Sequence, residues 1–194
     1  MTKAPQSDRL EPMNAVVFDL ETTGLSPAKD AILEIGAMVV EDGVLTGEVF
    51  HTLVNPGRSI PYFITRINGI RDSMVRDAPS IQTALPGFLE FIAGRQLVAH
   101  NASFDMGFIR ENANRLKLNP PMHAICTVEL SRQVFPRERS HNLDAVCSRL
   151  GLVPNGRHRA LADVEVTAQA FIKFQEMIVA RVSTRNPAHH MSDI

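Results

Sequence analysis

Three consecutive apolar segments rich in β-branched residues open the body of the chain, and they constrain its fold more than any other feature. They are Asn14–Leu20, Ile32–Val40 and Val44–Val54. Asp42-Gly43 joins the second segment to the third and is typical of a tight hairpin turn, and Pro56-Gly57 ends the third. We therefore predict an antiparallel three-strand meander at the start of the fold.

The spacing of apolar residues changes near residue 80 from that of strands to the three- and four-residue spacing of helices. We predict helices over Ser80–Ala93, Ser103–Lys117, Leu143–Leu150 and Ala160–Val182, and short strands over Gln96–His100 and Ala124–Cys126. A meander followed by mixed strands and helices predicts an α/β fold with a mixed central sheet flanked by helices.

Length and composition fit one globular domain, since the chain has 194 residues of which 44% are hydrophobic. We assign the body to residues 14–183, with a flexible N-terminus at 1–13 and a mobile tail at 184–194. The net charge of −1 does not indicate that the overall charge of the protein attracts nucleic acid, although a metal ion can supply positive charge locally.

The cysteines and the apolar runs bear on the compartment. Two cysteines provide no readable disulfide framework, which fits a reducing environment. No apolar run approaches the roughly 20 residues of a membrane helix, and the first twelve residues hold no apolar stretch of the kind found in a secretory signal. We expect a cytoplasmic protein without a membrane partner.

Acidic residues at the end of the first predicted strand form the first candidate site. Asp19 and Glu21 are two positions apart, so their side chains share one face of the strand. Gly24 follows in a turn and permits a ligand to approach the backbone closely. Taken alone, the pair also has an ordinary structural explanation, in which one acidic residue lies at the end of a strand and the other is exposed to solvent in the following turn.

Two later segments add acidic residues at the starts of predicted helices. Asp105 follows the short strand that ends near His100, where the helix dipole by itself favours an acidic residue. His158 and Asp163 are five residues apart, which on a continuous helix separates them by about 140°. A shared site therefore requires His158 on the preceding loop, with Asp163 in the first turns of the last helix.

Taken together and in this order, the three segments resemble the DEDDh exonucleases of the DnaQ-like group, which have an RNase H-like fold. The matching motifs are FDLETTGL at 18–25, HNASFD at 100–105 and HRALAD at 158–163. Within that group, INGI at 67–70 and HNLDA at 141–145 are similar to the epsilon-type proofreading exonucleases of bacterial replicative polymerases.

The resemblance implies hydrolysis of phosphodiesters from a 3′ end, with release of nucleoside monophosphates. Four clustered carboxylates repel one another unless cations are present, and oxygen ligands suit two Mg²⁺ or Mn²⁺ ions. It implies that Asp19 bridges both ions, that Glu21 holds one ion and the 3′-hydroxyl, and that Asp105 and Asp163 complete the coordination. It assigns His158 the role of general base, since an imidazole titrates near neutral pH.

The resemblance also implies residues that hold the substrate. Thr22 and its backbone are expected to contact the terminal sugar, Leu25 and Ile70 to wedge against the last bases, and Phe104 to enclose the site. Many relatives have histidine where this chain has Asn68, so the sequence does not define the polar contact at that position. Such contacts tolerate any base sequence.

Single-stranded DNA or a frayed 3′ end is the implied substrate, and a DNA polymerase catalytic subunit is an implied partner. The same reaction on RNA, and a non-catalytic domain that binds nucleic acid as a scaffold, are the alternative functions. A stand-alone enzyme is the alternative to a polymerase subunit, because no clamp-binding peptide is evident at 184–194.

Overall fold

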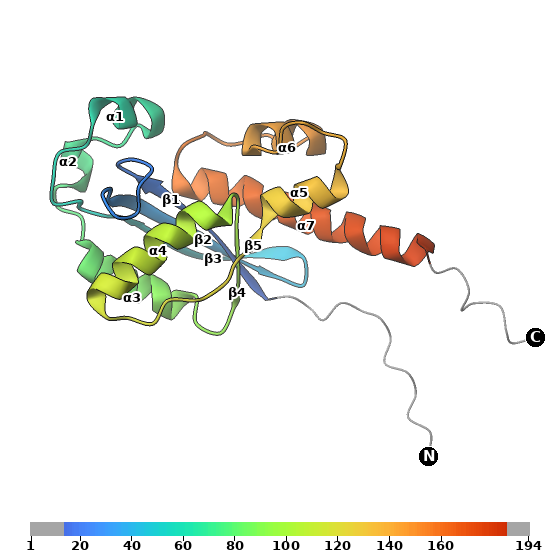
Figure 1. Ribbon diagram of the computed structural model, residues 1–194, viewed down its shortest axis with the longest axis horizontal. Coiled ribbons are helices and arrows are strands. Elements are labelled where there is room, and N and C mark those ends of the chain that lie inside the picture. Colours follow the sequence, from blue (N-terminus) through green and yellow to red (C-terminus); the bar gives the residue numbers. More distant parts are fainter. Residues whose placement is uncertain (1–13, 186–194) are drawn as a thin grey trace, which may run out of the picture.

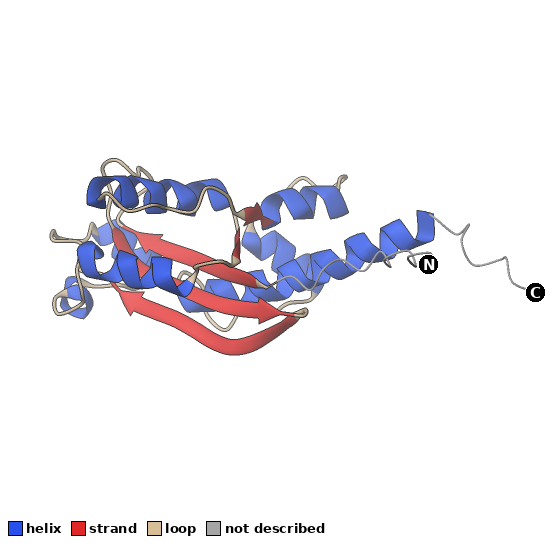
Figure 2. Ribbon diagram, turned by 90° about the horizontal axis from the view of Figure 1, so that it is seen from below, coloured by secondary structure: helices blue, strands red, loops and turns tan. Residues whose placement is uncertain are grey.

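One mixed five-stranded sheet forms the centre of the computed structural model, which describes residues 14–185 (Figures 1 and 2). The strands are β1 (Ala15–Thr22), β2 (Ile32–Glu41), β3 (Val44–Leu53), β4 (Gln96–Ala99) and β5 (Ile125–Cys126), in the order β3-β2-β1-β4-β5. The pairs β3–β2 and β2–β1 are antiparallel, whereas β1–β4 and β4–β5 are parallel. The predicted meander and mixed sheet are confirmed.

Helices cover both faces of the sheet. They are α1 (Tyr62–Asn68), α2 (Asp72–Val75), α3 (Ile81–Phe91), α4 (Ala102–Leu116), α5 (Thr127–Val134), α6 (Leu143–Leu150) and α7 (Ala160–Arg185). Val16 and Phe18 of β1 share a core with α3 and α4. Ala15 and Val17 contact α7 on the opposite face, because successive side chains of a strand point to opposite sides.

The segments predicted as helices at Ser80–Ala93, Ser103–Lys117, Leu143–Leu150 and Ala160–Val182 correspond to α3, α4, α6 and α7. The short helices α1, α2 and α5 were not predicted, because α1 and α2 have only seven and four residues and offer little periodicity. Helix α7 ends at Arg185, so the first two residues of the segment expected to be a tail are helical. The rest of that tail and the expected flexible segment 1–13 lie outside the described residues.

No helix between residues 14 and 185 is both long enough and apolar enough to span a membrane.

Candidate active site

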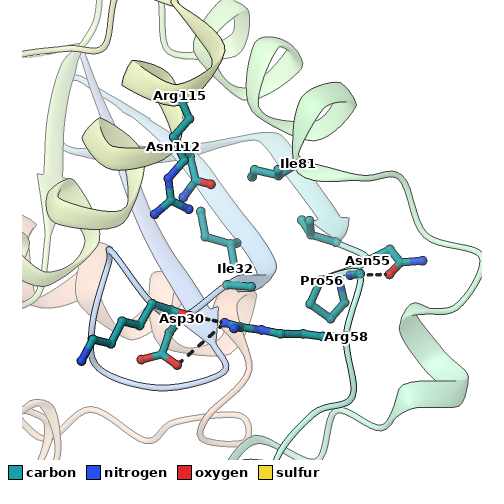
Figure 3. Close-up of a pocket in the computed structure, with 12 residues that line it drawn as sticks. Asp30, Ile32, Asn55, Pro56, Arg58, Ile81, Asn112 and Arg115 are labelled. Atoms are coloured by element: carbon teal, nitrogen blue, oxygen red, sulfur yellow. Dashed lines mark hydrogen bonds and ion pairs between the residues drawn. The ribbon is translucent and has the colours of Figure 1, made fainter.

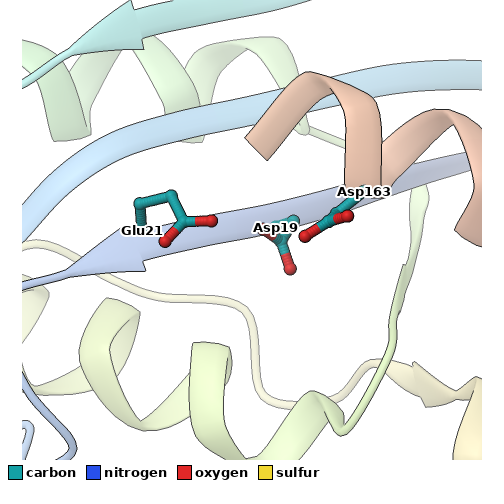
Figure 4. Close-up of side chains that lie close together, drawn as sticks. All are labelled: Asp19, Glu21 and Asp163. Atoms are coloured by element: carbon teal, nitrogen blue, oxygen red, sulfur yellow. The ribbon is translucent and has the colours of Figure 1, made fainter. Parts of the chain in front are cut away.

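Three carboxylates converge where β1 ends beside the start of α7. Asp19 and Glu21 lie on the same face of β1, and Asp163 reaches them from the first turn of α7 (Figure 4). One ligand oxygen from each of the three residues lies within 4.8 Å of the others. The first and last of the three acidic segments of the sequence therefore lie side by side in the structure.

A glycine on β2 allows α7 to start this close to the sheet. Gly36 pairs with Asp19 across the β1–β2 ladder. A Cβ atom at Gly36 would lie 2.9 Å from the backbone and the Cβ of Ala160, which is closer than such atoms approach in real structures. The missing side chain therefore leaves the room that the first turn of α7 occupies.

Glu34 of β2 fixes the same turn by hydrogen bonds. It is 1% exposed and accepts hydrogen bonds from Nε of Arg159 at 3.0 Å, from Nη2 of Arg159 at 2.7 Å and from the Ala160 N–H at 3.1 Å. His51 Nε2 lies 2.7 Å from its Oε1. Burial alone would raise the pKa of Glu34, but these hydrogen bonds outweigh burial and lower it. Glu34 thus satisfies an otherwise unpaired N–H at the start of α7.

Asp105 lies close to Asp19 and accepts a hydrogen bond from the backbone of β1. β4 ends at Ala99, and the buried Asp105 carboxylate accepts a hydrogen bond from the Leu20 N–H at 3.1 Å. Burial raises the pKa of Asp105 to about 8, although this hydrogen bond opposes the shift. Asp105 is not among the three residues whose ligand atoms converge, so its expected place in the ligand set stays a prediction.

The pKa values of the clustered acids reflect burial and mutual repulsion. Desolvation raises the pKa of Asp19 well above its usual range, and the charges of Asp105, Glu21 and Asp163 raise it further. Burial raises the pKa of Glu21 to about 7, against a hydrogen bond from Asn68. Burial also raises the pKa of Asp163. A cation among these groups would relieve the repulsion, and an all-carboxylate donor set fits a hard divalent ion.

Arg157 places a positive charge beside Asp163. Its Nη1 donates to Oδ1 of Asp163, and its Nε donates to Oδ1 of Asp144 at 2.7 Å. The neighbouring His158 lies on the loop before α7, as the spacing predicted, with an exposed side chain and a positive φ of 58°. The His158 N–H donates to Oδ2 of Asp163 at 3.2 Å. This loop is therefore tied to Asp163 through its backbone and through Arg157.

Three of the residues predicted to hold substrate lie on β1, in the turn that follows it and on α4; they are Thr22, Leu25 and Phe104. The Thr22 hydroxyl donates to the Gly24 carbonyl at 2.7 Å, whereas Leu25 is 85% exposed at the tip of the turn. Phe104 is half-buried, next to Asp105, and its ring centroid lies 5.1 Å from that of Phe108.

The predicted role of Ile70 as a wedge against bases is wrong for this structure. Ile70 is fully buried in a small core with Leu33 and Ile64, so its side chain has no surface to offer a base. Asn68 is also buried; its Oδ1 accepts from the Ile70 N–H at 3.0 Å, and its side chain hydrogen bonds to Glu21. Asn68 therefore contacts the site through the Glu21 carboxylate.

A pocket of about 260 Å³ lies against the loop that follows β1 (Figure 3). Its Arg58 donates to Oγ1 of Thr23 at 3.1 Å and to the Lys29 carbonyl at 2.7 Å. Its Arg115 donates to the Ala28 carbonyl at 2.8 Å. These arginines hold the loop that carries Leu25, and the pocket includes none of the clustered carboxylates.

Glu34, Arg157 and Arg159 are the site residues that the sequence analysis missed. Glu34 interrupts the apolar run Ile32–Val40, and a charge inside a strand buried on both faces signals a specific partner. Arg159 carries no comparable signal, because its partner Glu34 lies 125 positions away. Arg157 bonds to Asp163 and Asp144, six and 13 positions away, and neither separation is one that brings side chains together on a regular helix.

The family model and the relatives described here point to the same protein family. The family model RNase_T, described as Exonuclease, matches residues 16–171. The DNA polymerase III epsilon subunit of Aquifex aeolicus is 37% identical over 184 residues, covering 91% of this chain and 89% of that protein. The PolC-type DNA polymerase III of Caldanaerobacter subterraneus subsp. tengcongensis is 44% identical over 163 residues, or 84% of this chain, which spans only 12% of that polymerase.

A solved structure of exonuclease X in complex with 5′ overhanging duplex DNA has the same fold. It is 32% identical, with a TM-score of 0.67, and the match covers 84% of this chain and 91% of that one. The RNase H-like α/β fold is thereby confirmed. The chain belongs to the Exonuclease family.

Proposed function

We propose that the protein is a metal-dependent 3′–5′ exonuclease that removes nucleoside monophosphates from single-stranded DNA or from frayed 3′ ends. The observation that carries the proposal is the convergence of Asp19, Glu21 and Asp163, whose ligand atoms lie within 4.8 Å of one another. Acidic groups packed this closely, with raised pKa values, are typical of a functional site.

Two Mg²⁺ or Mn²⁺ ions are the proposed cofactors, held by Asp19, Glu21 and Asp163, with Asp105 completing the set. When bound, such ions stabilise the attacking and leaving oxygens of a phosphoryl displacement. The residues fit this role because all donors are carboxylate oxygens, which are the ligands of hard divalent cations.

The surrounding side chains have separate proposed tasks. His158 acts as general base, because it lies on an exposed loop whose N–H is bonded to Asp163. Asn68 orients Glu21 through their side-chain hydrogen bond. The exposed Leu25 packs against the terminal base, and Ile67 of α1, which is 54% exposed, takes the contact that the sequence assigned to Ile70.

A DNA polymerase catalytic subunit is the proposed partner, with proofreading as the cellular role. Support comes from the epsilon subunit that matches this chain over 89% of its length. Co-purification with a polymerase from the source cells supports the partnership, and a lone active species in extracts argues for a stand-alone enzyme.

A time course on end-labelled oligonucleotides tests the activity. Single-stranded DNA labelled at its 5′ end should shorten to a ladder, whereas DNA labelled at its 3′ end should release labelled mononucleotide from the first time points. Both reactions should require Mg²⁺ or Mn²⁺ and stop with chelator. Asp19→Asn is the matched control, since it keeps the shape of the side chain and removes the charge.

Three other results of these assays would change the proposed function. An RNA strand degraded in preference to DNA of the same sequence would replace the DNA assignment with the RNA alternative. Undiminished activity of Asp19→Asn would place the chemistry elsewhere, and no activity with either metal would support the non-catalytic scaffold.

A further inference from the structure

A larger cavity, of about 740 Å³, is lined by residues of α5, of the loop between α5 and α6, and of the turn after β4. We call it the α5 groove. Its walls are Arg132 of α5 and the loop that carries Glu138, Arg139, His141 and Asn142, and its floor at one end is the His100-Asn101 step after β4. None of the residues so far assigned to the site lines it.

The charge of the α5 groove is positive and uncompensated. Arg132 and Arg139 are exposed, and neither forms an ion pair or a side-chain hydrogen bond with any residue between 14 and 185. The single acidic residue of the lining, Glu138, is paired with Arg149 at 3.2 Å. Two guanidinium groups are therefore available to an anionic ligand.

Hydrogen bonds hold the loop that forms one wall of the groove. Both ring nitrogens of His141 are engaged, since Nε2 donates to the Glu138 carbonyl at 3.1 Å and Nδ1 lies 2.8 Å from the Ser131 hydroxyl. Asn142 caps α6 by accepting from the Ala145 N–H at 2.9 Å. The backbone that carries Arg139 is thus held on both sides, which lowers the entropic cost of binding.

The α5 groove adjoins the carboxylates at two places. β1 and β4 are parallel with Val17 opposite Val98, so the turn at His100 leaves the sheet at the same end as Asp19 of β1. On the other wall, Asp144 follows Asn142 closely in the chain and shares Arg157 with Asp163. A strand whose last phosphodiester lies at the carboxylates can therefore continue into the groove.

We propose that the α5 groove binds the backbone phosphates of the DNA strand upstream of the bond that is cut, with Arg132 and Arg139 as the phosphate contacts. The proposal rests on the proposed function and adds the path of the substrate to it. One guanidinium group can donate two parallel hydrogen bonds to the oxygens of a phosphate. Contacts to phosphates carry no base preference. The groove gives a protein of net charge −1 a local positive surface for a polyanion.

The test compares Arg132→Gln/Arg139→Gln with Arg71→Gln/Arg76→Gln, each in the Asp19→Asn background so that the DNA stays intact. Arg71 and Arg76 are exposed arginines at α2, far from α5 in Figure 1. Fluorescence anisotropy with a labelled single strand of about ten nucleotides gives the affinity at several salt concentrations. The unfolding midpoint of each variant verifies that it is folded.

We expect the groove variant to bind the strand roughly tenfold more weakly, with the slope of log K against log salt less steep by about 1.4, since each single-strand phosphate contact contributes about 0.7. The α2 variant should keep the wild-type slope. With the wild-type Asp19 restored, the loss of kcat/KM should be larger for the ten-nucleotide strand than for a dinucleotide.

Failure of this inference differs from failure of the proposed function. Suppose that the wild-type protein degrades DNA. If the groove variant then binds with the affinity and salt slope of Asp19→Asn alone, or if the α2 variant loses as much affinity as the groove variant, the groove is not the path of the strand. If the wild-type protein degrades no nucleic acid with either metal, the proposed function itself is wrong.

Discussion

Burial and mutual repulsion keep protons on the clustered acids of the metal-free protein near neutral pH. Glu21 has a pKa of about 7 and Asp105 a pKa of about 8, both raised first by desolvation. In the unfolded chain the same groups titrate near 4. Between these values the folded state binds more protons than the unfolded state, so raising the pH destabilises the fold.

The metal-free protein is therefore predicted to lose stability as the pH rises from about 5.5 to about 8.5. Urea unfolding in the presence of chelator measures the free energy of unfolding at each pH. Glu34 does not affect this pH range. Its pKa is lowered in the folded state, so its contribution to stability is lost only when the pH falls into the acidic range. Asp105→Asn is the control, since it still accepts the Leu20 N–H but no longer titrates. A free energy of unfolding that rises over this window would contradict the pKa directions.

Replacement of His158 by alanine is predicted to lower kcat by about 10²–10⁴-fold, the usual contribution of a general base. The side chain is exposed and its N–H bond to Asp163 uses the backbone, so the fold should be retained. Steady-state kinetics on single-stranded DNA measures the effect. His123→Ala removes another exposed imidazole and should keep the wild-type kcat. An equal loss in both variants would remove His158 from the mechanism.

At the scale of secondary structure, the site depends on where the first turn of α7 lies against β2. Glu34 binds Arg159 and the Ala160 N–H, and Gly36 leaves room for Ala160. Asp163 and His158 lie on either side of this contact. The position of two site residues is therefore set by residues of β2 that have no chemical role in the reaction.

Gly36→Ala is predicted to destabilise the protein by about 1–3 kcal/mol, the usual cost of overpacking, and to lower kcat up to about 100-fold as α7 shifts. The added Cβ would lie 2.9 Å from backbone of Ala160, which cannot rotate away. Thermal unfolding and steady-state kinetics measure the two effects.

Gly87→Ala is the matched control for that substitution. Its Cβ would lie 3.7 Å from the Phe50 ring, an ordinary contact, and Gly87 lies inside α3, where alanine favours the helix by up to about 1 kcal/mol. This variant should be as stable as the wild type or more stable. Similar losses in both variants would show that the contact at Gly36 has no special role.

Across the whole molecule, the topology of the sheet brings together residues that are distant in the sequence. β1 lies between β2 and β4, so Asp19 and Glu21 are next to the α7 start on one side and close to Asp105 on the other. The antiparallel half of the sheet supplies Glu34 and Gly36, and the parallel half supplies the β4–α4 turn. The site lies where the two halves meet.

Much of this arrangement was predictable from the sequence. The strands of the meander follow from their β-branched runs, and the loop position of His158 follows from its five-residue separation from Asp163. The burial of Ile70 was not predictable, because α1 and α2 are too short to show which face is apolar. The Glu34–Arg159 pair joins residues 125 positions apart, and no local pattern encodes such a contact.

Calorimetric titration with Mn²⁺ near pH 8 tests most directly whether the carboxylates form a metal centre. We predict that wild-type protein takes up two ions per chain and that Asp19→Asn loses uptake of at least one. Each bound Mn²⁺ should stabilise the wild type by about 2.7 kcal/mol at 100 times the Kd of its site. Absence of uptake by the wild type, or the same uptake by Asp19→Asn, would contradict this prediction.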